Sequence, residues 1–171
     1  MLLGTTFEVA DASIHNLKNF DCGKQSLNEY LSRFAVKNNV LGLSRTWVLP
    51  CQSNENKAQI AAYFTLASSS VSRESLPKQS KSLPAYPIPI VLLARLAVSI
   101  DHQHKQLGIK TLVYALRTAY SINQHGLPAI GVVIDVLDDD AMKFYQHVGI
   151  FTQFSDDPMR LFVQMDIINQ L

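Results

Sequence analysis

The sequence has little cysteine. Cys22 and Cys51 are its only two cysteines, and they stand in unrelated local contexts. Two cysteines cannot form a disulfide framework, and no Cys-x-x-Cys pair is present for zinc binding or redox chemistry. Two isolated thiols in a chain of this size favour a reducing compartment.

The sequence also has no long hydrophobic run. The longest extends from Ile88 to Val98 and is interrupted by Pro89 and Arg95. About 18 consecutive apolar residues are needed to span a bilayer. The N-terminus lacks the basic start and apolar stretch of a secretory signal peptide. We therefore expect a soluble, cytoplasmic protein with no membrane partner.

Charged residues are also few, and neither sign of charge predominates. Only 17% of the residues are charged and the formal net charge is +1, which excludes a histone-like polycation but not a local basic face. Residues 1–100 carry ten basic and six acidic side chains, whereas residues 101–171 carry five and eight. The N-terminal part therefore has the better chance of meeting a polyanion, although ordinary surface variation produces differences of this size too.

Hydrophobic residues, in contrast, make up 47% of the 171 residues. At this length folding buries roughly 70% of the unfolded surface, which stabilises one domain without metals or disulfides. We interpret residues 1–171 as a single domain with no linker.

Hydrophobic patterning predicts strands mixed with helices. We expect a helix over 27–38 capped by Ser26, and a surface loop over 72–89 because it contains four prolines. Further helices are expected from the loop at 105–110 to about 124 and over 138–148, and strands over 6–9, 45–51, 59–70, 90–100, 130–136 and 159–167. The strand–loop–helix–strand order of 90–136 favours an α/β domain with a central mixed sheet flanked by helices.

One loop can be matched to chemistry. The segment Lys105-Gln-Leu-Gly-Ile-Lys110 follows an apolar strand and opens a helix. Such a turn brings unpaired backbone N–H groups and the positive end of a helix dipole together, where a pyrophosphate can bind. Glycine lets the backbone approach the ligand closely. Taken alone, one glycine before a helix is a weak signal, because ordinary strand–helix turns share it.

The motifs around this loop resemble a known family. They are Leu93-x-Arg-Leu-Ala-Val98, Asp101 and Ala141-x-x-Phe-Tyr145-x-x-x-Gly149, with the loop at 105–110 standing where the family has Gln/Arg-x-x-Gly-x-Gly/Ala. In this order they are similar to the GCN5-related N-acetyltransferase (GNAT) family. The block Phe20-Asp-Cys-Gly-Lys-Gln-Ser-Leu27, followed by Lys37-Asn38 and Gly42-x-Ser-Arg-Thr46, resembles the GNAT toxins of type II toxin–antitoxin modules. The resemblance runs from about residue 7 to residue 165.

The resemblance implies an acetyl-CoA-dependent N-acetyltransferase with a single GNAT-like domain. Backbone groups of Leu96, Ala97 and Val98 would hold the pantetheine arm and the thioester carbonyl. Tyr145 stands where the family places its general acid, which protonates the leaving thiolate. The pyrophosphate would be cradled by Lys105, Gln106, Leu107, Gly108, Ile109 and Lys110.

The toxin branch adds an acceptor and partners. Its acetyl acceptor is the free α-amino group of an aminoacyl-tRNA, and acetylation of that group blocks translation. A toxin of this kind is normally paired with a ribbon-helix-helix antitoxin, and homodimers are common in the branch.

The loop departs from the family pattern at three positions. Lys105 stands where Gln or Arg is usual, Gln106 replaces a common glycine, and Lys110 occupies the final Gly/Ala position. The ammonium group of Lys110 would either attract the pyrophosphate or obstruct the cofactor with its bulk.

Arg33, Lys37, Arg45 and Arg95 are the candidate contacts to tRNA. Phosphate binding needs several cations on one face, and Arg33 and Lys37 are four residues apart on the expected helix. A solvated helix surface is the alternative interpretation. Arg95 stands inside an apolar strand, where a cation is costly unless it has a partner. It is expected to face the active cleft, with a buried salt bridge as the alternative.

We expect no metal site. His102 and His104 are spaced like metal ligands, but no cluster of carboxylates or thiols accompanies them. The run Asp138-Asp-Asp140 is interpreted as a helix start that is favoured by the helix dipole.

Two other functions stay open at this point. A GNAT enzyme that acetylates a small amine or a protein N-terminus would show the same donor motifs. A non-catalytic binding module that has lost acetyl-CoA would keep the fold alone.

Overall fold

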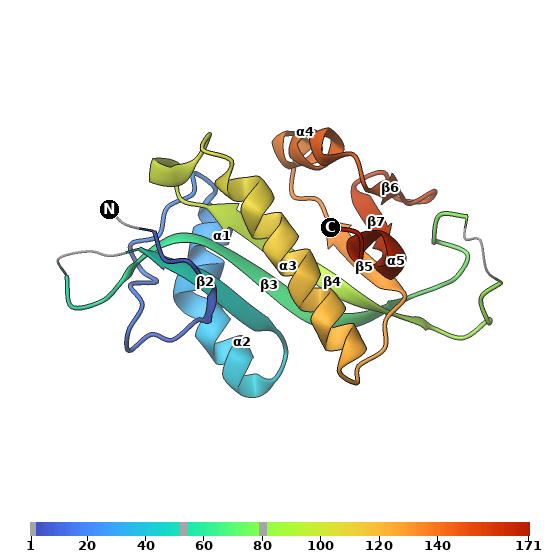
Figure 1. The fold of residues 1–171 in the computed structure, drawn as a ribbon, viewed down its shortest axis with the longest axis horizontal. Helices are drawn as coiled ribbons and strands as arrows, with labels where there is room; N and C mark the ends of the chain where they lie inside the picture. The colour runs from blue at the N-terminus through green and yellow to red at the C-terminus, as the bar shows by residue number, and fades with distance from the viewer. Residues whose placement is uncertain (1–2, 52–54, 79–81) are drawn as a thin grey trace. The chain divides into compact units, whose positions relative to one another are not determined.

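The computed structural model describes residues 3–51, 55–78 and 82–171. Within these residues seven strands form a mixed sheet in the order β1-β2-β3-β4-β5-β7-β6, flanked by helices (Figure 1). The predicted α/β fold class is therefore confirmed. The chain divides into two compact units, residues 1–66 with 95–112 and residues 67–94 with 113–171. The extent of a single domain over 1–171 stays a prediction.

The first unit is built on antiparallel strands. β1 (Glu8–Val9) pairs with β2 (Arg45–Cys51), and β2 pairs with β3 (Gln59–Val71). The strands expected over 45–51 and 59–70 are thus confirmed, whereas the first strand is shorter than expected. The register of β2 shifts between Leu49 and Pro50, because proline has no N–H to donate to a ladder.

A helical segment follows in three parts, α1 (Gln25–Glu29), a π-helical turn η1 (Tyr30–Phe34) and α2 (Ala35–Leu41). It begins two residues earlier than expected, and Lys24 rather than Ser26 is the N-cap residue. It ends at Leu41 because Gly42 adopts a left-handed φ of 72°. The expectation of one regular helix capped by Ser26 over 27–38 was therefore wrong at both ends.

The two faces of the sheet in the first unit are covered by different elements. Tyr30, Leu31 and Ala35 of the helical segment pack with Tyr63 of β3 and Ala97 of β4 (Ile88–Val98). The opposite face contains Val98, which packs with Ala61, Ala62 and Leu107. Neighbouring residues Ala97 and Val98 thus point to opposite faces, as the period of a strand requires. Both faces are covered, so residues 60–66 of β3 are all buried.

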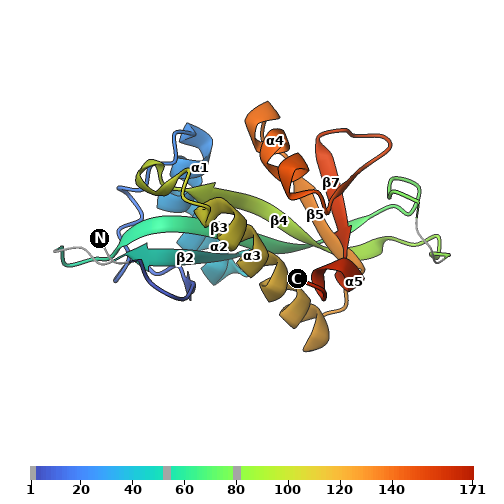
Figure 2. The same cartoon turned by 45° about the horizontal axis from the view of Figure 1, so that its top comes forward.

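The second unit contains β5 (Gly131–Asp135), α4 (Asp139–Val148), β6 (Thr152–Gln153), β7 (Arg160–Gln164) and α5 (Met165–Ile168). β4 pairs with β5 in parallel, and β7 runs antiparallel to β5. Because β5 and β7 run in opposite directions, α4 and α5 follow them at opposite ends (Figure 2). The strand expected over 159–167 ends at Gln164, where α5 begins, and β6 was not expected. The expected loop over 72–89 includes residues 79–81, which lie outside the described residues, and its last two residues belong to β4.

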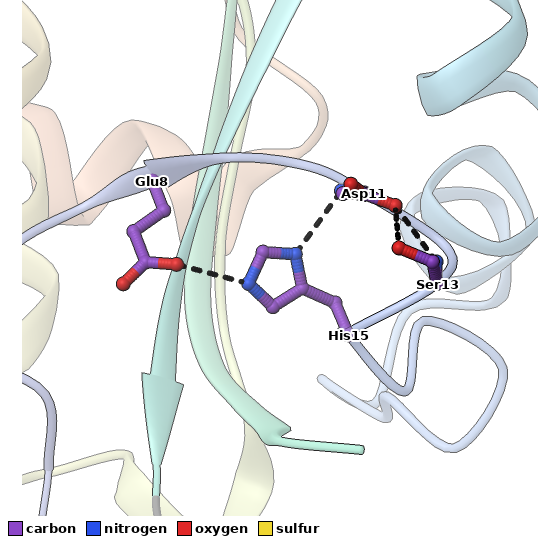
Figure 3. Close-up of polar contacts among 4 residues, drawn as sticks. All are labelled: Glu8, Asp11, Ser13 and His15. Atoms are coloured by element: carbon purple, nitrogen blue, oxygen red, sulfur yellow. Dashed lines mark hydrogen bonds and ion pairs between the residues drawn. The ribbon is translucent and has the colours of Figure 1, made fainter.

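A buried histidine organises the irregular segment after β1. His15 is 2% exposed. Its Nδ1 accepts a hydrogen bond from the backbone N–H of Asp11 at 3.0 Å, and its Nε2 lies 3.3 Å from the carboxylate of Glu8 (Figure 3). The backbone N–H and the hydroxyl of Ser13 donate to the Asp11 carboxylate, and these bonds lower the pKa of Asp11. Side-chain partners therefore add to the isolated β-bridge that His15 forms with Ala58 in holding this segment.

None of the helices in the described ranges combines the length and the apolar character that crossing a membrane would require.

Gly131 offers a test of the packing in the second unit. A Cβ at this position would lie 2.3 Å from the carbonyl oxygen of Val163 and 2.5 Å from the ring of Phe162. We expect Gly131→Ala to lower the free energy of unfolding by about 3 kcal/mol, because backbone and a buried ring cannot both move away. Urea denaturation measures this change.

Gly42→Ala is the matched control. Gly42 also needs its φ of 72°, but nothing lies within 4 Å of an added Cβ. Its cost is the left-handed conformation alone, about 1 kcal/mol. Equal destabilisation by the two substitutions would contradict the packing argument.

Candidate active site

The C-terminal part of β4 carries three of the predicted donor-binding residues. Leu96, Ala97 and Val98 belong to the first unit. The parallel register of β4 with β5 covers Val91–Leu93, so these three residues lie beyond the paired segment. The N–H of Ser99, directly after the strand, donates to the carbonyl of Ala61 at 2.8 Å. The strand therefore ends at a fixed position.

A short turn then leads into α3 (Leu107–Gln124). His104 and Gln106 have left-handed φ angles of 59° and 62°. These two residues complete the reversal of the chain, so the helix begins at Leu107. Residues 107–110 are consequently its first turn, and the expectation of a loop over the whole of 105–110 was wrong. The left-handed φ of Gln106 explains why glycine is common there, since a side chain in this conformation costs about 1–2 kcal/mol.

The first turn of α3 has the features of an anion-binding site. The backbone N–H groups of Leu107, Gly108 and Ile109 precede the first turn that could supply an intrahelical acceptor, whereas the N–H of Lys110 donates to the carbonyl of Gln106. The side chain of Lys110 is exposed. Amides without an intrahelical acceptor and an exposed lysine are thus available together at the positive end of the helix dipole.

Lys105 has a different environment. Its Nζ donates to the carbonyl of Asp101 at 2.8 Å, so its ammonium group supports the turn itself. It also lies close enough to His102 to act with burial in lowering the pKa of that imidazole. His102 is therefore neutral at pH 7.

The N-terminal motif is attached directly to this turn. The N–H of Ile100 donates to the carbonyl of Asp21 at 2.9 Å. The side-chain amide of Gln103 donates to the carbonyl of Cys22 at 3.0 Å and to that of Val98 at 2.9 Å. The segment that resembles the toxin branch thus holds the end of β4 in place. Sequence reasoning missed Gln103, because no local pattern indicates a contact across 81 residues of chain.

Arg95 stacks on an aromatic ring. Its guanidinium carbon lies 3.8 Å from the ring centroid of Tyr30. Among the residues that the structure describes, no carboxylate pairs with Arg95, so the alternative of a buried salt bridge was wrong. That Arg95 faces the active cleft stays a prediction. The role of Tyr30 was missed because the aromatic ring fits the apolar pattern of its helix.

Tyr30 itself sits in a polar environment at its hydroxyl end. The hydroxyl lies 3.1 Å from Oγ of Ser44. Burial disfavours the phenolate, but hydrogen bonds outweigh burial and lower the pKa of Tyr30. The side chains that form these bonds are Ser44, Thr46, Thr65 and Asn38.

The remaining cations predicted to meet tRNA are exposed and lie in the first unit. Arg33 belongs to η1, Lys37 to α2, and Arg45 begins β2. Their contact with RNA stays a prediction. The shared face of Arg33 and Lys37 was argued from α-helical spacing, whereas Arg33 lies in a π-helical turn in which the N–H of Ala35 bonds five residues back, to Tyr30.

Tyr145 lies in the second unit, on α4. Asp138 caps this helix by accepting a hydrogen bond from the N–H of Ala141 at 2.9 Å, which confirms the interpretation of Asp138-Asp-Asp140 as a helix start. Tyr145 is 6% exposed, and its ring contacts those of Phe144 and Phe151 edge-on. Burial raises its pKa. The phenol therefore keeps its proton throughout the physiological pH range.

Within the described ranges, no group of three or more His, Cys, Asp and Glu side chains is arranged to hold a metal ion. His102 and His104 therefore belong to no such group.

Comparison with known proteins identifies the family. No protein-family model matches the chain. A curated relative from Mycobacterium tuberculosis, named tRNA-acetylating toxin, is 32% identical over 158 residues, which are 92% of this chain and 89% of the relative.

Solved structures give the same result. AtaT complexed with acetyl-methionyl-tRNAfMet is 28% identical, with a TM-score of 0.85 over 96% of this chain and 97% of that one. AtaTR bound with AcCoA is 27% identical, with a TM-score of 0.81 over 96% of each chain. A mutant AtaT bound to the C-terminus of the antitoxin AtaR is 24% identical and shares the fold, with a TM-score of 0.80 over 96% of each chain. With a relative of this identity along nearly its whole length, the chain belongs to the tRNA-acetylating toxins of the GCN5-related N-acetyltransferase family.

Proposed function

We propose that this protein transfers the acetyl group of acetyl-CoA to the α-amino group of an aminoacyl-tRNA and thereby blocks translation. The observation that carries the proposal is the match to a tRNA-acetylating toxin over 92% of the chain. The left-handed turn before α3 and the buried, protonated Tyr145 support it, since both suit the chemistry of acetyl transfer.

The donor would be held by backbone groups. Acetyl-CoA carries a pyrophosphate, and the N–H groups of Leu107, Gly108 and Ile109 at the start of α3 suit such an anion. Lys105 and Gln106 shape the turn, and Lys110 adds a positive charge from the first helical turn. The backbone of Leu96, Ala97 and Val98, beyond the segment of β4 paired with β5, would hold the pantetheine arm and the thioester carbonyl. A backbone N–H there would stabilise the charge that develops on the carbonyl oxygen.

Acetyl transfer needs one proton donor and a neutral amine. The α-amino nitrogen attacks the thioester carbon, and the C–S bond breaks to release the thiolate of CoA. Tyr145 would protonate this thiolate, since its phenol retains its proton. A free α-amino group has a reference pKa of about 8, so a substantial fraction is neutral near pH 7.5. A water molecule then suffices to accept the proton released from the amine.

The partners follow from the family. We propose a ribbon-helix-helix antitoxin that binds the enzyme, a homodimer as the working assembly, and the cytoplasm as the compartment, where aminoacyl-tRNA is present. The exposed side chains of Arg33, Lys37 and Arg45, together with Arg95, would contact the tRNA.

Labelled acetyl-CoA tests the proposal directly. Purified protein should label aminoacyl-tRNA and leave deacylated tRNA, polyamines and peptides with free N-termini unlabelled. Labelling of a polyamine or a peptide without labelling of aminoacyl-tRNA would instead establish the alternative GNAT activity. Calorimetry with acetyl-CoA addresses the other alternative, because a binding module that has lost the donor would show no micromolar binding.

Tyr145→Phe removes the proposed acid and keeps the ring. We expect the acetylation rate to fall by about 10²-fold or more, because general acid catalysis contributes 10²–10⁴-fold. Acetyl-CoA affinity and the melting temperature should change little, since the edge-on ring contacts remain. Phe144→Leu is the neighbouring control, and it should retain most of the activity. Unchanged acetylation by the Tyr145→Phe protein would refute the role.

Lys110 tests the donor site. Its side chain is exposed and free to turn toward a pyrophosphate, so we expect attraction rather than obstruction. Lys110→Ala should weaken acetyl-CoA binding about three- to tenfold, with a smaller effect at high salt because the attraction is screened. Lys143→Ala, which removes an exposed lysine of α4, is the charge control. Tighter binding by the Lys110→Ala protein would show that the lysine obstructs the cofactor.

A further inference from the structure

The guanidinium group of Arg95 is an unusual cation. Arg95 is half-buried in β4, and arginine stays charged even in such a place. Within the described residues its guanidinium group forms no hydrogen bond and no ion pair. The guanidinium carbon lies 3.8 Å from the centroid of the Tyr30 ring. The ring offsets part of the desolvation cost without neutralising the charge. The five N–H donors of the guanidinium group therefore remain available to an anion.

Tyr30 is built as a rigid support for this group. It is 5% exposed, and its hydroxyl is bonded to Ser44. Its ring stacks on that of Tyr63 at a centroid distance of 6.5 Å, and the hydroxyl of Tyr63 donates to the carbonyl of Leu27. The ring of Tyr30 is thus fixed at its hydroxyl and along one side, while Arg95 lies over it.

The π-helical turn begins at this tyrosine. The carbonyl of Tyr30 accepts from the N–H of Ala35, five residues ahead. Such turns are rare and occur frequently at functional sites. Here the turn sets the position of Tyr30, whose ring lies against the guanidinium group of Arg95.

The side of β4 on which Arg95 lies indicates which phosphate it binds. Arg95 shares a face with Ala97, two residues along the strand, and that face is covered by the helical segment that contains Tyr30. The first residue of α3, Leu107, packs with Val98 on the other face. The proposed pyrophosphate site and Arg95 thus lie on different faces of the strand. A second phosphate-bearing ligand, rather than acetyl-CoA, suits Arg95.

We infer that Tyr30 is a positioning residue that holds the guanidinium group of Arg95 for a backbone phosphate of the acceptor RNA. This inference rests on the proposed function, since it names a contact for the proposed acceptor. A stacked, planar guanidinium group can bind a phosphate in bidentate fashion, which a lysine cannot do.

Binding of tRNA at a series of salt concentrations tests the inference. Arg95→Gln should weaken tRNA binding about tenfold and reduce the slope of log K against log salt by about one, the signature of one lost phosphate contact. Arg95→Lys should not restore the affinity, because stacking and bidentate geometry are both lost. Acetyl-CoA binding by calorimetry should be unchanged in both variants. Lys78→Gln, at an exposed lysine in a loop of the second unit, is the charge control.

Variants of Tyr30 separate positioning from folding. Tyr30→Phe keeps the ring, so its tRNA affinity and salt slope should match those of the wild type even if the lost bond to Ser44 lowers the melting temperature. Tyr30→Leu should raise KM for aminoacyl-tRNA and lower the salt slope as Arg95→Gln does, with kcat little changed. The double variant Tyr30→Leu with Arg95→Gln should bind no worse than Arg95→Gln alone.

Several results would overturn the inference. Additive losses in the double variant would show that the two residues act separately. A weakened acetyl-CoA affinity in Arg95→Gln, with tRNA binding intact, would assign the arginine to the donor. Wild-type tRNA affinity in Arg95→Lys would show that stacking is not needed. This measurement tests the inference even if the Tyr30→Leu protein does not fold. A wild-type protein that acetylates no aminoacyl-tRNA would instead remove the proposed function itself.

Discussion

The side-chain amide of Gln103 holds two carbonyl groups at once, that of Val98 at the end of β4 and that of Cys22 in the N-terminal turn. With the bonds from Ser99 to Ala61 and from Ile100 to Asp21, it fixes the point at which the strand stops. Everything after that point depends on it, because the left-handed turn and the direction of α3 are set from a fixed strand end. The proposed pyrophosphate site therefore depends on the set of hydrogen bonds that fixes the end of β4, two of which come from the amide of Gln103.

The elements that the sequence predicted well are those whose signals are local. β2 was predicted from its alternating, β-rich residues, and β3 from the apolar residues that nearly fill its first half. The start of α4 was predicted from the acidic run Asp138-Asp-Asp140. The elements that differed depend on contacts elsewhere. The π-helical turn places Tyr30 against residues of β3 and β4, and α5 begins where Met165 N–H reaches the carbonyl of Ile130. No pattern within a short window contains these distant partners.

The candidate site divides in the same way. Tyr145 and the loop at 105–110 could be predicted as site residues because family motifs are contiguous and keep their spacing. Gln103 and Tyr30 were missed because each acts through a residue far away in the chain, Cys22 in one case and Arg95 in the other. The role of Gln106 could be predicted only in part. The sequence shows that it replaces a glycine of the family pattern, but only the structure shows that its backbone has a left-handed φ of 62°, which glycine adopts without strain. Replacement of that glycine indicates strain that the rest of the turn must outweigh.

Burial of Tyr145 has opposite effects on the two properties that a general acid needs. It raises the pKa of the phenol. The phenol therefore keeps its proton, but it is also a weaker acid. A thiolate in water, with a reference pKa of about 8.5, would not take a proton from such a phenol. The same apolar surroundings, however, raise the proton affinity of any anion that forms beside the ring. For Tyr145 to serve as the acid, the leaving sulfur must therefore be as dry as the phenol, and exclusion of water at the thioester becomes a requirement of the chemistry.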